Sequence, residues 1–187
     1  MAEAKPKSIG ITGAASGVGV THLAVTLANY SAAHKKRKTA VIELSGNHAF
    51  EKMTGTSEPG EWNRVAYYPN VKQYHIAEIL SGDYEVVIFD MGNAYYRVRT
   101  ELLRCDEKLI VGSLAPWRKA EYENFVLEEM GEDRWVRGMI FLAQYGMKRD
   151  KKDFVKTAGV PVYNLPFIRE PVKADKTCFE FLNGFLV

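Results

Sequence analysis

A glycine-rich loop near the start of the chain has residue types and a spacing that could bind a ligand. Residues 11–28 read "ITGAASGVGVTHLAVTLA", an apolar run followed by the loop and then by a helical pattern. Glycines let the backbone come close to a ligand, and the free amides at a helix N-terminus attract phosphate groups. The loop therefore predicts a dinucleotide site, a nucleoside triphosphate site, or a tight strand-to-helix turn without a ligand.

One interpretation is a nicotinamide-dependent oxidoreductase. The loop "TGAASGVG" at 12–19 is similar to the TGxxxGxG loop of short-chain dehydrogenases, and Glu43 could hold a ribose hydroxyl. Those enzymes use Tyr-x-x-x-Lys, in which the lysine lowers the pKa of the tyrosine. The sequence offers this pair only at Tyr68 and Lys72, and Val126 stands four residues after Tyr122, where a lysine is needed. The missing pair weighs against NAD(P) chemistry.

The loop also resembles that of the ParA/MinD family of deviant Walker A ATPases, which reads GKGGVGKTT. Residues 14–22 are "AASGVGVTH", with Thr21 at the position of the family's first threonine. The resemblance continues in order and spacing over most of the chain. It is carried by "AVIELSG" (40–46), "YEVVIFDMG" (84–92), "LRCDEKLIVGSLAP" (103–116) and "GVPVYNLPFIREPVKAD" (159–175).

The resemblance implies which residues would hold ATP or ADP with Mg²⁺. Asp90, as the Walker B-type acid, would hold the metal together with Thr21. Gln144 and Pro166 would lie beside the adenine base, with Phe167 close by. The phosphate loop would consist of Ser16, Gly17, Val18, Gly19, Val20, Thr21 and His22.

The departures from the family pattern fall on charged positions. Val20 occupies the Walker lysine position and Ala15 the signature lysine position, while Ser45 replaces the aspartate that helps to place the attacking water. Each lost charge-assisted contact is worth about 1.5–3 kcal/mol. We therefore predict weak or absent nucleotide binding, no efficient hydrolysis, and a role in positioning or assembly through contacts with a protein partner. The resemblance includes atypical family members attached to pilus and secretion machines, which suggests that kind of role.

Two other interpretations of this loop stay open. A family member with an unrecognised cation would be an active ATPase. In a loop without a ligand, Thr21 would cap the helix and Asp90 would cap the turn after its strand. The family's dimers enclose nucleotide and use the signature lysine across the interface, so with Ala15 any homodimer is expected to be independent of ATP.

The elements that must position these residues alternate between strand and helix. Apolar runs such as "VVIF" and "LIVG" are typical of strands covered on both faces. We predict a doubly wound α/β fold of the P-loop NTPase type, with a mostly parallel sheet flanked by helices. One domain is expected over 1–187, with an irregular loop or insertion at 54–70. The predicted strands are Ile9–Thr12, Ala40–Leu44, Val86–Asp90, Leu109–Ser113, Val136–Ala143, Val160–Leu165 and, with a weaker pattern, Val65–Tyr68.

Composition favours a cytoplasmic protein without a strong nucleic-acid or membrane signal. The chain has 25 Lys and Arg against 23 Asp and Glu, two isolated cysteines, and an N-terminus, "MAEAKPKS", without the apolar stretch of a signal peptide. The C-terminal run 178–187 is apolar and has no Lys or Arg, so we expect it to pack on the core and not on a membrane. Trp117 is expected to pack at a helix start.

Overall fold

One eight-stranded sheet runs through the computed structural model, which describes residues 5–186. The strand order is β3-β4-β2-β5-β1-β6-β7-β8, and neighbouring strands are parallel except for β3 and β4. The strands are β1 (Lys7–Gly13), β2 (Thr39–Glu43), β3 (Gly60–Trp62), β4 (Val65–Tyr68), β5 (Val86–Asp90), β6 (Glu107–Ser113), β7 (Met139–Gln144) and β8 (Val162–Asn164).

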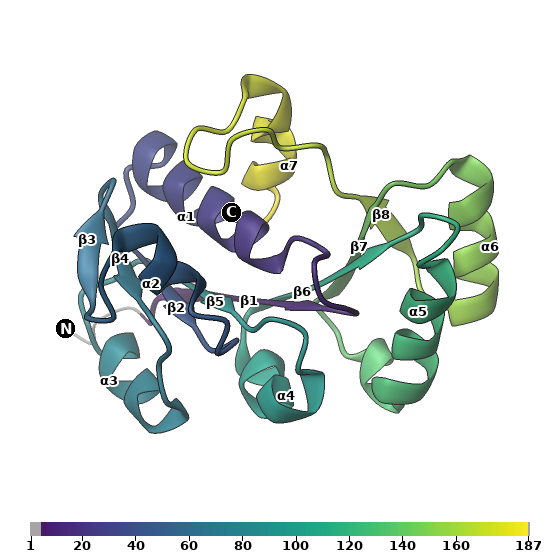
Figure 1. The fold of residues 1–187 in the computed structure, drawn as a ribbon, viewed down its shortest axis with the longest axis horizontal. Helices are drawn as coiled ribbons and strands as arrows, with labels where there is room; N and C mark the ends of the chain where they lie inside the picture. The colour runs from purple at the N-terminus through teal and green to yellow at the C-terminus, as the bar shows by residue number, and fades with distance from the viewer. Residues whose placement is uncertain (1–4, 187) are drawn as a thin grey trace.

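Helices cover both faces of this sheet, as the uniformly apolar strands require. Figure 1 shows α1 and α7 on one side of the sheet and α3, α4 and α5 on the other. The helices are α1 (Val20–His34), α2 (Ala49–Thr54), α3 (Ile76–Leu80), α4 (Tyr95–Arg104), α5 (Lys119–Asn124), α6 (Lys148–Ala158) and α7 (Phe179–Asn183). A π-helical turn (Phe125–Glu129) extends α5, and 3-10 turns lie at Gln73–His75, Gly131–Trp135 and Lys176–Cys178. The predicted doubly wound α/β fold is confirmed.

Each face of the sheet carries its own buried cluster. On the α1 face, Ile9 and Ile11 of β1 pack with Leu23 and Leu27 of α1. On the other face, residues of α4, α5 and α6 pack together, and the ring of Tyr122 fills the space beside Gly112 of β6. A Cβ atom on Gly112 would lie 2.2 Å from that ring, so only glycine fits there. The two clusters make the central strands the rigid support of the loops that follow them.

The predicted strands are all present, with differences in length. Val65–Tyr68 and Val86–Asp90 have the predicted bounds. β7 begins at Met139 and not at Val136, because a 3-10 turn precedes it and Gly138 has a φ of 82°. The strand β3 was not predicted: it forms a hairpin with β4 inside the stretch 54–70, so this stretch is more regular than expected.

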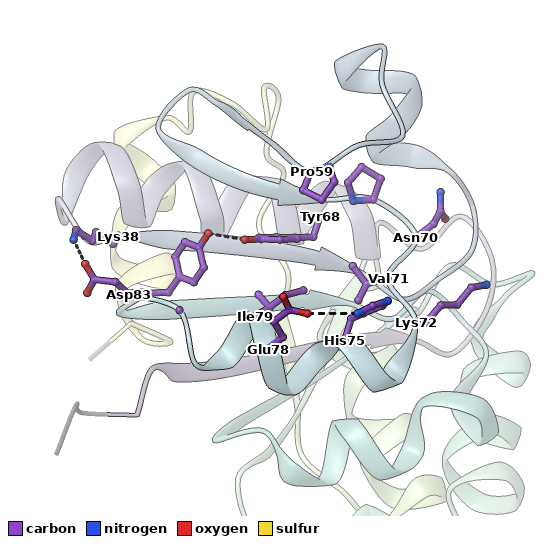
Figure 2. A pocket seen from close by; sticks show the side chains of 13 residues that line it. Lys38, Pro59, Tyr68, Asn70, Val71, Lys72, His75, Glu78, Ile79 and Asp83 are labelled. Carbon is purple, nitrogen blue, oxygen red and sulfur yellow. Dashed lines mark hydrogen bonds and ion pairs between the residues drawn. The ribbon is translucent and has the colours of Figure 1, made fainter.

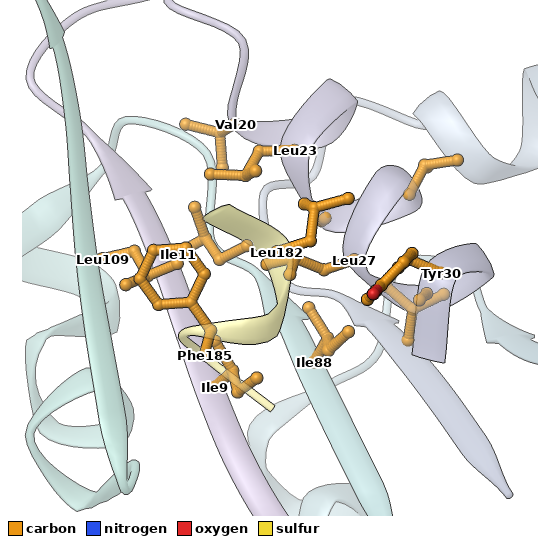
Figure 3. Packing of buried hydrophobic residues seen from close by; sticks show 14 of the residues in the cluster. Ile9, Ile11, Val20, Leu23, Leu27, Tyr30, Ile88, Leu109, Leu182 and Phe185 are labelled. Carbon is orange, nitrogen blue, oxygen red and sulfur yellow. The ribbon is translucent and has the colours of Figure 1, made fainter. Parts of the chain in front are cut away.

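The C-terminal segment lies against α1 and the sheet, as predicted for its described part. Leu182, Phe185 and Leu186 are buried with Ile9 and Leu27 in the cluster that Figure 3 shows. The hydroxyl of Tyr30 in α1 donates to Asn183 over 3.1 Å. Val187 lies outside the described residues. The segment therefore completes the core on the α1 face.

Candidate functional site

The loop between β1 and α1 has the backbone shape that its glycines predict. Gly17 and Gly19 have φ values of 73° and 89°, in the left-handed region that favours glycine. A Cβ atom on Gly19 would lie 2.7 Å from the side-chain nitrogen of Gln144. Thr21 and His22 follow in the first turn of α1. The loop thus directs the first amides of a 15-residue helix toward the carboxyl edge of the sheet, where an anion would be stabilised.

The two predicted metal-binding side chains are in direct contact. Thr21 Oγ1 donates to Asp90 Oδ2 over 2.6 Å, and the amide of Gly92 donates to Asp90 Oδ1 over 3.1 Å. Burial raises the pKa of Asp90 to about 6, against the effect of these two hydrogen bonds. A hydroxyl and a carboxylate are the pair of protein ligands that Mg²⁺ takes when substrate phosphates and water supply the others. The pair therefore fits a magnesium ion bound together with phosphate.

Two hollows meet at Gly19 and His22, one on each side of the loop's end. The first, of about 340 Å³, is lined by the loop 15–22 and by Asn47, Gly92 and Asn93. The second, of about 310 Å³, is mostly apolar and contains Gln144 and Pro166 together with Leu23, Tyr145, Leu165, Phe167 and Ile168. A hollow lined by the loop backbone that adjoins a mostly apolar one suits a nucleotide, with phosphates in the first and a base in the second. The fold thus brings all the predicted site residues to one edge of the sheet.

Asn47 and Asn93 are site residues that sequence reasoning missed. Both are exposed, and each directly follows a glycine with positive φ, Gly46 or Gly92, just beyond the end of a strand. That position could have indicated them, because glycine turns after parallel strands lead into the ligand-binding edge. They place two neutral amide side chains opposite the loop, where they can donate to phosphate oxygens.

The two positions at which the resemblance expects lysines are part of the core. Ala15 and Val20 are both buried in the cluster on the α1 face, and Val20 Cγ2 would lie 2.9 Å from a Cβ atom on Gly13. The backbone of the predicted phosphate loop is therefore shaped for a nucleotide, but the two positions that would carry lysines have apolar side chains packed in the core. His22 lines both hollows, and its Nε2 atom lies 2.8 Å from the carbonyl oxygen of Ile168, which belongs to the second one.

Glu43 has a structural role at the end of β2. Its carboxylate is fully buried and accepts hydrogen bonds from the amide of Ala49 over 2.8 Å and from the hydroxyl of Ser45 over 3.1 Å. The carboxylate thereby caps the first turn of α2. Both oxygens are directed into the protein, since the second contacts the amide of Phe50 at 3.4 Å. Neither Glu43 nor Ser45 is free to orient a water molecule.

The dehydrogenase interpretation is not supported. Tyr122 is fully buried, and its hydroxyl lies 3.1 Å from the carbonyl oxygens of Ile110 and Leu142 in the middle of the sheet. Burial raises the pKa of this phenol well above 10, so it cannot act in proton transfer. Tyr68 lies at the end of β4, and its hydroxyl contacts that of Tyr84 at 2.8 Å.

A larger hollow lies away from this edge, between the β3–β4 hairpin and α3 (Figure 2). It has a volume of about 790 Å³, with the Tyr68–Tyr84 pair at its centre. Among its titratable side chains Lys38 pairs with Asp83, His75 lies 3.6 Å from Glu78, and Lys72 is a further cation. No set of like charges converges there on a ligand, so the loop edge remains the candidate site.

Three further observations concern Trp117, metal-binding clusters and membrane-spanning helices. Trp117 is 84% exposed, so the prediction that it packs at a helix start is wrong: the ring extends from the β6–α5 loop into solvent. Residues 5–186 contain no cluster of three or more His, Cys, Asp or Glu side chains suited to a metal ion. None of the helices in this range is both long enough and apolar enough to span a membrane.

Solved structures with the same fold include one with a bound nucleotide analogue and one described as an ATPase. A plasmid partition protein (BB_S35) of Borrelia burgdorferi B31 bound to AMPPNP aligns over 98% of this chain and 97% of its own, with 14% identity and a TM-score of 0.68. A ParA family ATPase of Chlorobium tepidum TLS aligns over 98% and 90%, with 15% identity and a TM-score of 0.64. MinD of Aquifex aeolicus in its complex with MinC aligns over 96% and 86%, with 16% identity and a TM-score of 0.56. No protein-family model and no curated protein matches the sequence. These structural neighbours are ATPases of the ParA/MinD family, and the chain shares their P-loop NTPase fold.

Proposed function

We propose that this chain is a degenerate member of the ParA/MinD family that does not hydrolyse ATP efficiently and acts through contacts with other proteins. The observation that carries the proposal is the burial of apolar side chains at the two positions where the family has lysines. Ala15 and Val20 are buried in apolar packing, while the glycines of the loop and the contact of Thr21 with Asp90, at the end of β5, suit a nucleotide site. A loop that keeps its backbone shape but has no lysine fits a protein that uses the fold for another purpose than ATP hydrolysis.

Nucleotide binding remains part of the proposal, in a weak form. The loop amides, Asn47 and Asn93 can contact phosphate, and the adjoining apolar hollow with Gln144 and Pro166 can hold a base. Hydrolysis needs more, because charge develops on the transferred phosphoryl group and an attacking water must be placed. The chain offers no lysine in the loop and no acid at Ser45 for these tasks.

Positioning or assembly within the cytoplasm is the role that this fold suggests. The structure of MinD in complex with MinC gives an example of a fold neighbour that binds a protein partner. The exposed aromatic side chains of Trp117, Tyr145 and Phe167 extend from the loops after β6, β7 and β8, on the same edge as the phosphate loop. Exposed aromatic groups gathered near one edge are typical of protein-binding surfaces.

An ATP turnover assay tests this proposal directly. Phosphate release with Mg²⁺ and saturating ATP is expected to equal that of the Asp90→Ala variant, which lacks the metal-binding acid. A combined Ala15→Lys, Val20→Lys and Ser45→Asp variant serves as a gain-of-function comparison and is expected to hydrolyse faster, provided its thermal melt shows that it folds. Turnover by the wild-type chain that Asp90→Ala abolishes would overturn the proposal and favour an active ATPase.

A further inference from the structure

One arginine from a distant part of the chain contacts the phosphate loop. Arg118 lies in the connection between β6 and α5, and its Nη2 atom donates to the carbonyl oxygen of Ser16 over 2.8 Å. Its Nε atom donates to Glu121 over 3.0 Å, and about a quarter of the side chain is exposed. The guanidinium group therefore spans from the start of α5 to the loop across 102 positions of sequence.

Other cations near this edge are held elsewhere. Arg97 donates to the carbonyl oxygen of Ser45 over 2.7 Å, and Lys52 donates to that of Asn47 over 3.2 Å. Arg118 differs because its acceptor, Ser16, belongs to the phosphate loop itself. The next residue is Gly17, where an added Cβ atom would have no heavy atom within 4 Å. Arg118 is not among the residues that line the phosphate hollow, so binding a phosphate oxygen requires its side chain to leave the Ser16 carbonyl and rotate toward that hollow.

We propose that Arg118 supplies in cis the positive charge that the loop lacks, and that it binds the phosphate groups of a magnesium-bound nucleotide. This inference rests on one part of the proposed function, which is that the chain still binds nucleotide. It adds the residue that supplies the positive charge. A guanidinium presents several donors in one plane and matches phosphate oxygens better than a point charge does. Ser16 and Glu121 hold it beside the loop before a ligand arrives, which lowers the entropy lost on binding.

Binding of three ligands to matched variants tests the role of Arg118. Isothermal titration with MgATP, magnesium tripolyphosphate and adenosine would be carried out on the wild type, Arg118→Ala, Arg118→Lys and Arg149→Ala. Arg149 is the control arginine, because it is 91% exposed and its nearest acidic partner is Asp153 of its own helix. We expect Arg118→Ala to weaken MgATP and tripolyphosphate at least tenfold, Arg118→Lys to weaken them less, and Arg149→Ala to leave both unchanged. Adenosine binding should not respond to any of these variants.

The outcomes separate this inference from the proposed function. Equal affinities of Arg118→Ala and the wild type for MgATP, or an absence of wild-type binding at millimolar MgATP, would overturn the role of Arg118 and leave the absence of turnover untouched. Rapid turnover by the wild type would overturn the proposed function. The role of Arg118 would still be decided by comparing the MgATP affinities of Arg118→Ala and the wild type. Should Arg118→Ala fail to fold, Arg118→Lys keeps the charge and most of the reach, Arg118→Gln is a shorter neutral polar side chain, and a weaker affinity of the neutral variant is then the expected result.

Discussion

At the scale of single residues, Asp90 carries a charge that the folded chain disfavours. Burial raises its pKa from 3.8 to about 6, so the folded state holds a proton that the unfolded state releases at lower pH. Between these two values the free energy of unfolding must fall as the pH rises, by about 3 kcal/mol at 1.36 kcal/mol per pKa unit. Above about pH 6 the folded chain thus contains a buried carboxylate that lowers its stability.

Asp90→Asn is therefore expected to stabilise the ligand-free protein at neutral pH. The asparagine oxygen can accept from the Gly92 amide and its nitrogen can donate to Thr21, so both contacts of the carboxylate are replaced. Urea unfolding near pH 7.5 should show a gain of about 1–3 kcal/mol, and near pH 3.5 almost none. An equal or lower stability of the variant at pH 7.5 would mean that Asp90 is already ionised without penalty.

Asp106→Asn is the matched control and is expected to act in the opposite direction. Burial raises the pKa of Asp106, but hydrogen bonds from the amide and hydroxyl of Ser8, at 2.8 and 2.6 Å, outweigh it and lower the pKa. A lowered pKa gives stability that is present above about pH 3.9 and is lost as the pH falls. The variant should therefore be less stable than the wild type at pH 7.5.

The residues of the candidate site differ in how far the sequence could reveal them. Gly17, Gly19, Thr21 and Asp90 stand in a motif with fixed spacing, and the structure brings them together as the motif requires. Arg118 could not be found in this way, because its contact with Ser16 depends on the β6–α5 connection passing beside the loop. A side chain that reaches a site from a distant element is placed there by the fold, and the sequence around it contains no motif that reveals this.

At the scale of elements, the C-terminal helix is held by a few large apolar side chains. Phe185 is buried against the α1 face with Leu182, as Figure 3 shows, while Phe167 is 87% exposed at the sheet edge. Phe185→Ala is expected to lower the free energy of unfolding by about 3 kcal/mol, and Phe167→Ala by less than about 0.5 kcal/mol. Urea unfolding measures both, and similar values for the two variants would mean that α7 does not depend on this contact.

The elements were predictable where burial is uniform and less so at the edges. The apolar runs "VVIF" and "LIVG" belong to the central strands β5 and β6, and all the predicted strands are found in the sheet. β3 was missed because its three residues are exposed and its sequence, Gly60–Trp62, has no apolar alternation. Its pairing with β4 depends on the tight turn at Asn63 and Arg64, both with positive φ; asparagine favours this conformation, but arginine does not. Edge strands depend on such turns more than on their own composition.

At the scale of the whole molecule, the same edge of the sheet carries the phosphate loop, Arg118 and the exposed aromatic side chains. A dimer that enclosed nucleotide at this edge would bring two sets of phosphate charges together, which requires cations that cross the interface. Ala15 offers none, and Arg118 is directed at the loop of its own chain. Association at this edge is therefore expected to rest on apolar contact and to be insensitive to ATP.

Light scattering coupled to size exclusion tests this last prediction. The mass of the wild type is expected to be the same with and without MgATP, whether that mass is one chain or two. A Trp117→Ser and Phe167→Ser variant should have a lower dimer fraction if the wild type dimerises through this edge, because it removes two largely exposed aromatic groups without disturbing the core. A shift to dimer that requires MgATP and disappears in Asp90→Ala would contradict the prediction, since it would show that nucleotide bridges two chains without the signature lysine. The charge of Arg118 would then have to act across the interface and not within one chain.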